Sequence, residues 1–162
     1  LKKKARPKAL SEVRWATRQL SKATGVKFKF RGRTKEIPRA KKQVKSADLV
    51  VSYVTPRQAK SFPLAGRTVG FGGAWWDGQG KRMSGFVLID TPQSKHMPLS
   101  RKGGATRPSV VMHELGHVVG LLHVKRRGEQ MFPSITRDSP STYARGDRAG
   151  LRKLGAKAGC VR

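Results

Sequence analysis

The spacing of apolar residues predicts three helices. In residues 9–25 apolar side chains recur every three or four positions, and a glycine at the end is a typical stop signal. A second helix is predicted over 108–120, with Pro108 in the favoured first turn. A third helix, over 147–159, starts at Asp147 as a plausible cap. The positions expected to face the core are Leu10, Val13, Ala16 or Thr17 and Leu20 in the first helix, and Val111, Leu115, Val118 and Leu122 along the second.

Other segments have the composition of β-strands. Residues 26–31 alternate strictly, with Val26, Phe28 and Phe30 on one face, which predicts a half-buried strand. The β-branched run 48–54 predicts a central strand. Two further strands are expected over 67–76 and 84–91, joined by the turn 77–83. Residues 32–47 are expected to form a loop that includes a short helix near 39–46, and residues 92–107 a polar loop. No repeat or second domain is visible, so residues 1–162 are expected to form one domain, with a basic flexible arm over 1–8.

The net charge of the chain indicates a further class of binding partner. The 162 residues include 36 Lys and Arg against nine Asp and Glu, a net charge of +27. Such a balance favours association with polyanions such as nucleic acid or anionic cell-wall polymer. No apolar run of about 20 residues exists that could span a membrane. Cys160 is the single cysteine, so it cannot form a disulfide within this chain.

The segment "HELGHVVGLLH" holds three of the four histidines. Residues four apart share one face of a helix, so His113 and His117 present their imidazoles to one point. Gly120 can end the helix in a left-handed turn that brings His123 back toward them. Three imidazole nitrogens with an open fourth position are the arrangement of a catalytic zinc site. Glu114 lies at the edge of the same face, within reach of a water bound there.

The full spacing H-E-x-x-H-x-x-G-x-x-H, followed by "GEQMFPSI", is the metzincin signature with its Met-turn. The chain resembles metzincin zinc metallopeptidases, and within them the matrixin-like bacterial branch. "ADLVVSYV", "TVGFGGAW" and "SGFVLID" are similar to the family's strands, and "YARGDRAGLRKLG" to its closing helix. The resemblance implies an α+β fold: a small twisted mixed sheet packed on two long helices, with the Met-turn and a short C-terminal helix after the active-site helix.

The resemblance also implies an activity, zinc-dependent endopeptidase. Glu114 would be the general base that activates the zinc-bound water, and Met131 the hydrophobic floor of the site. Substrate would pair as an extended strand near Gly73 or Ala74. The pocket for the side chain after the scissile bond would be walled by Pro133, Ser134 and Ile135. Trp75 and Trp76 fit either substrate stacking or packing within the hairpin.

One catalytic Zn²⁺ is expected. Few carboxylates lie between residues 55 and 107, so neither calcium nor a structural zinc is expected. The resemblance further implies a secreted monomer that acts on peptides or proteins and associates non-specifically with anionic polymers. The alternative interpretation is a polycationic binding module for nucleic acid or anionic cell-wall polymer, whose zinc site is inert. An intact Glu114 favours the enzyme.

Overall fold

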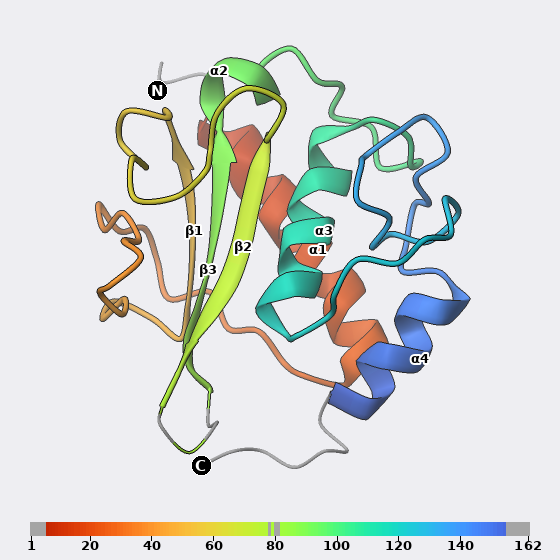
Figure 1. Cartoon of the computed structure of the whole chain (residues 1–162), viewed down its shortest axis with the longest axis horizontal. Coiled ribbons are helices and arrows are strands. Elements are labelled where there is room, and N and C mark those ends of the chain that lie inside the picture. The colour runs from red at the N-terminus through yellow and green to blue at the C-terminus, as the bar shows by residue number, and fades with distance from the viewer. Residues whose placement is uncertain (1–5, 78, 80–81, 155–162) are drawn as a thin grey trace.

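The computed structural model describes residues 6–77, 79 and 82–154, and Cys160 lies outside them. The elements in chain order are α1 (Arg6–Thr24), β1 (Leu49–Val54), β2 (Gly70–Trp76), β3 (Arg82–Asp90), α2 (Thr91–Ser94), α3 (Arg107–Val118) and α4 (Arg145–Leu154). Figure 1 shows the strands on one side of the molecule and the three longer helices on the other. None of the helices in this part of the chain combines the length and the apolarity needed to cross a membrane.

The three strands form a mixed sheet in the order β1-β3-β2. β3 runs parallel to β1 and antiparallel to β2. Along β3, Val87 and Ile89 enter a core cluster shared with the helices, whereas Phe86 and Leu88 enter a second cluster on the opposite face. Both faces of β3 are therefore covered, which explains its continuous apolar sequence. The strand predicted to be central, β1, is instead an edge of the described sheet, and β3 is the central one.

α1 and α3 pack against each other and cover one face of the sheet (Figure 1). Ala16 and Leu20 of α1 are fully buried there, as are Val111 and Leu115 of α3. α4 packs against α1 and adds Leu151 to the same cluster. The predicted α+β class, a small mixed sheet on two helices with a short helix after them, is confirmed.

Two predictions for residues 26–46 are wrong. Residues 26–31 form no strand, and Phe28 and Phe30 are 37% and 51% exposed. Alternation indicates a strand only if a neighbouring strand supplies hydrogen-bond partners, and the described sheet pairs β3 with β1 and β2 alone. Residues 39–46 contain a turn closed by Arg39 and Lys42, not a helix. The Glu36 carboxylate accepts the backbone N–H groups at positions 45 and 46, which a helix would need for its own ladder.

Several boundaries also differ from the predicted ones. α1 begins at Arg6, so the last residues of the predicted basic arm are helical, while residues 1–5 lie outside the described chain. The short α2, capped by the Asp90 carboxylate, begins at the last residue of the predicted strand 84–91 and continues into the predicted loop 92–107. α4 begins two residues before Asp147. Asp147 is therefore not the cap but lies in the first turn, where its carboxylate accepts the Ala144 N–H.

Candidate metal centre and active site

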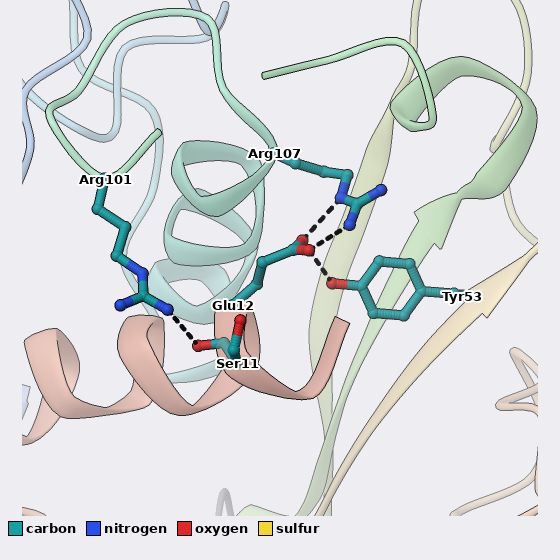
Figure 2. Close-up of polar contacts among 5 residues, drawn as sticks. All are labelled: Ser11, Glu12, Tyr53, Arg101 and Arg107. Carbon is teal, nitrogen blue, oxygen red and sulfur yellow. Dashed lines mark hydrogen bonds and ion pairs between the residues drawn. The ribbon is translucent and has the colours of Figure 1, made fainter. Parts of the chain in front are cut away.

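The helix α3 carries most of the candidate site, and its start is fixed by polar contacts. Thr106 is the N-cap, and its hydroxyl oxygen accepts the Ser109 N–H at 3.3 Å. The next residue, Arg107, is buried and forms an ion pair with the buried Glu12 of α1. The Tyr53 hydroxyl of β1 donates to the same carboxylate at 3.1 Å (Figure 2). One carboxylate therefore joins α1, β1 and the first turn of α3.

The end of α3 is a tight left-handed turn. Gly120 has φ +102°, its N–H donates to the His117 carbonyl, and the Leu121 N–H donates to the Gly116 carbonyl. These two bonds define a Schellman motif, which needs a residue without Cβ at the position of Gly120. The turn reverses the chain so that His123 faces α3. The prediction of a turn at Gly120 is thus confirmed in its geometry.

The three histidines converge as the spacing predicts. The Nε2 atom of His123 lies 3.2 Å from that of His113 and 3.1 Å from that of His117, and the latter two Nε2 atoms are 3.2 Å apart. The Nδ1 atoms of His113 and His117 each lie 2.8 Å from a backbone carbonyl, those of Gln130 and Leu121 respectively. A carbonyl only accepts, so both Nδ1 atoms carry the proton and both Nε2 atoms present lone pairs.

This donor set fits a zinc ion. Lone pairs facing each other at this distance repel unless a cation lies between them. A tetrahedral ion with Zn–N bonds of about 2.0–2.1 Å separates its ligand nitrogens by about 3.3 Å. Burial, the largest cause, lowers the pKa of His113 to about 4 and also lowers the pKa of His117. Both rings are therefore neutral at pH 7, as metal ligands must be. The three residues form a group able to hold a metal ion.

Glu114 lies between α3 and the glycine-rich strand β2. It is 7% exposed, and burial raises the pKa of its carboxyl to about 8, opposed by a hydrogen bond from the Gly72 N–H. A Cβ at Gly70 would lie 2.6 Å from the carboxylate, and one at Gly72 only 2.2 Å from the backbone oxygen of Glu114. Only glycine permits this approach. Side chains at either position would push the helix and the strand apart.

The segment after the third histidine forms the floor of the site. Met131 is fully buried, and a Cβ at Gly116 would lie 2.4 Å from its sulfur, so the thioether lies directly against α3. The Asp147 carboxylate accepts the N–H groups of Gln130 at 2.7 Å and of Met131 at 3.2 Å. The Gln130 carbonyl is the group that orients His113. Met131 and the ring of His113 are therefore positioned together.

The predicted substrate-binding residues lie on exposed or half-buried segments. Gly73 and Ala74 belong to β2, which is an edge of the described sheet. Pro133 and Ser134 are exposed, and Ile135 packs partly against the core. For the tryptophans, packing within the hairpin is what the structure shows at Trp75, whose ring centroid lies 4.5 Å from that of Phe86.

One predicted core residue is wrong, and several site residues were missed. Leu122 is 81% exposed, because the turn at Gly120 breaks the helical stripe and directs Leu121 inward instead. The carbonyls that orient the histidines were not predicted as site residues, and neither were Gly70 and Gly72 of β2. The contacts of these carbonyls depend on tertiary structure and are not visible in the sequence. The one available signal was that Gln130 directly precedes Met131. The glycines were visible as an unusual strand composition.

The fold and this site define the class of protein. Three convergent imidazoles, a neighbouring buried glutamate and a buried methionine lie together on an α+β scaffold, in the order that the sequence signature sets. The matrixin family model matches residues 2–155, so the chain belongs to the matrixin family of zinc metallopeptidases. It is similar to mouse matrilysin, with 28% identity over 114 residues. That match covers 69% of this chain and 42% of matrilysin, so the chain spans less than half the length of this relative.

Proposed function

We propose that this chain is a zinc-dependent endopeptidase. The observation that carries the proposal is the convergence of three Nε2 atoms, with separations of 3.1–3.2 Å, beside the helix α3 that carries the buried Glu114. His113, His117 and His123 would hold one ion and leave a fourth position open. When bound, zinc acts as a Lewis acid toward the scissile carbonyl and brings the pKa of its water near 7.

The residues of the chain supply the proton transfers and the positioning. Glu114 would take a proton from the attacking water and deliver it to the leaving amine, a role that needs its ionised form. Burial alone disfavours that form, and the positive charge of a bound zinc ion would favour it. The Gly72 N–H, which donates to this carboxylate, fixes its orientation. The carbonyls of Gln130 and Leu121 fix the tautomers of the two helical histidines. Met131 packs against α3 at Gly116 and would take no part in the chemistry.

The edge of β2 is the proposed substrate platform. An extended peptide would add as a strand beside Gly73 and Ala74, whose backbone groups lie at the edge of the described sheet. Pro133, Ser134 and Ile135 would wall the pocket for the side chain after the scissile bond. Peptides and proteins are therefore the proposed substrates.

Some parts of the proposal rest on the family resemblance. We infer that residues 1–162 act as one catalytic domain, secreted and monomeric, of the bacterial branch of the family. A single catalytic zinc, without calcium or a structural zinc, stays a prediction.

Metal removal tests the proposal most directly. Chelation with 1,10-phenanthroline is expected to abolish cleavage of a quenched fluorescent peptide library, and added Zn²⁺ should restore it. His123→Ala should lose both zinc, measured by elemental analysis, and cleavage. His96→Ala, which changes the remaining, exposed histidine, should keep both.

Peptide cleavage that survives complete metal removal would contradict the proposal. The alternative function, a polycationic binding module with an inert site, predicts a different result. The protein would then bind one zinc ion and anionic polymer, yet no peptide in the library would be cut.

The turn after α3 gives a second prediction. Gly120→Ala adds a Cβ at φ +102°, where a side chain costs about 1–2 kcal/mol, although the residue touches no ligand. Because the strain displaces His123, zinc affinity should fall by about 5–30-fold. A competition titration against a chromophoric chelator measures it. Gly128→Ala is the matched control, since a Cβ there meets nothing within 4 Å and the backbone has no positive φ. Equal zinc affinities for the two variants would show that the turn does not position the ligand.

A further inference from the structure

A hollow of about 200 Å³ lies beside α1, and its lining includes none of the three clustered histidines. Its lining comes from α1 and from one residue of the loop before α3. The lining residues are Leu10, Ser11, Arg14, Trp15, Arg18 and Arg101. None of them belongs to the proposed peptidase site. Two are apolar, three carry a guanidinium group, and none is acidic.

The three arginines come together from two parts of the chain. Arg14 and Arg18 are four residues apart on α1 and share one face of the helix. Arg101 reaches them from the loop, and its Nη2 donates to the Ser11 carbonyl in a long hydrogen bond of 3.5 Å (Figure 2). The guanidinium of Arg14 lies 5.2 Å from the centroid of the Phe30 ring, a contact that restricts its orientation. The hollow therefore has cations on two sides.

No carboxylate neutralises these cations within the described residues. The ion pairs of that part of the chain are Arg107 with Glu12 and Arg137 with Asp138. Glu12 is the acidic residue of α1, and it is turned inward, where it is 2% exposed and occupied by Arg107 and Tyr53 (Figure 2). The outer face of the helix is thus left with unbalanced positive charge. Like charges that line one hollow repel one another, and a bound anion would reduce this repulsion.

We propose that this hollow binds a phosphate ester whose organic group is apolar or aromatic. Guanidinium groups present planar pairs of N–H donors that match the oxygens of a phosphate. Leu10 and the half-buried Trp15 supply an apolar wall for the attached group, and an indole face suits an aromatic ring. The site is independent of zinc and of peptide hydrolysis. It differs from general attraction to polyanions because three named arginines, and not the total charge, determine it.

Calorimetric titration with phenyl phosphate, inorganic phosphate and phenol tests the site. Phenyl phosphate should bind more tightly than inorganic phosphate, and phenol should show no binding. The triple variant Arg14→Gln, Arg18→Gln, Arg101→Gln should weaken phenyl phosphate binding by about tenfold or more, because charged hydrogen bonds are lost. The control triple variant Arg33→Gln, Arg57→Gln, Arg67→Gln removes the same charge from exposed positions outside the hollow and should bind normally.

Two outcomes would overturn the proposal. Equal losses in both triple variants would show that the overall field of the protein attracts the anion. Unchanged binding in the first variant would place the ligand elsewhere. Trp15→Leu changes the apolar wall and leaves the three arginines in place. The affinity for phenyl phosphate should fall toward the affinity for inorganic phosphate, and the affinity for inorganic phosphate should stay unchanged. Circular dichroism of each variant establishes that it is folded.

Discussion

Glu114→Gln is expected to lower kcat for peptide cleavage by about 10²–10⁴-fold, the usual contribution of a general base. Glutamine has the size of glutamate and can still accept the Gly72 N–H, so the fold and the zinc content should be unchanged. Its amide cannot take a proton from water at neutral pH. The measurement is kcat and KM on one peptide, with zinc quantified in the same preparation.

Glu36→Gln is the matched control for this experiment. It makes the same chemical change in a surface loop, where the carboxylate accepts backbone N–H groups of Lys45 and Ser46. Cleavage by this variant should equal that of the unmodified protein. If Glu114→Gln cleaves the peptide as fast as the control does, the assignment of the general base is wrong.

The second large effect is expected at the buried ion pair beneath α3. Glu12→Gln leaves the Arg107 guanidinium buried without a counter-charge, and breaking such a pair costs about 3–5 kcal/mol of the free energy of unfolding. Arg107 also stands in the first turn of α3, where the helix dipole disfavours a cation. The carboxylate removes both penalties. Urea denaturation monitored by circular dichroism measures the change.

Two further variants identify the cause of that loss. The double variant Glu12→Gln, Arg107→Met removes both charges and should regain most of the stability, because no uncompensated ion remains. Tyr53→Phe removes only the hydroxyl that donates to Glu12 and should cost about 1 kcal/mol. Burial, then the nearby carboxylate, raises the pKa of Tyr53, so this hydroxyl stays protonated. A double variant as unstable as Glu12→Gln would show that packing, not charge, is responsible.

Those parts of the molecule that depend on neighbours in sequence were predictable. The spacing of His113 and His117 on one helix turn, and the glycine needed at position 120, follow from local geometry and were confirmed. The apolar run of β3 also identified a strand, but it could not show which strand would be central. Sheet order depends on pairings between residues far apart in the sequence.

The errors have the same origin. The alternation in residues 26–31 is a strand pattern, yet its aromatic side chains are exposed because the described sheet provides no partner there. Leu122 was predicted to face the core because the helical spacing was extended past Gly120, whereas α3 ends at Val118. The glycines in "GFGG" indicate that some group approaches the strand closely. They do not show that this group is Glu114 of α3, which lies against Gly70 and Gly72. The net charge of the chain carries no information about its fold.

The Asp147 carboxylate sets a limit on how far the polypeptide could be shortened from its C-terminal side. It accepts N–H groups from Gln130, Met131 and Ala144, all of which contribute to the turn beneath the histidines or to the start of α4. A chain ending before this residue would leave the buried N–H groups of the turn without acceptors, each at about 1–3 kcal/mol. It would also lose Leu151, a fully buried member of the core cluster to which α1 and α3 contribute. The last helix is therefore part of the folded core and not an appendage to it.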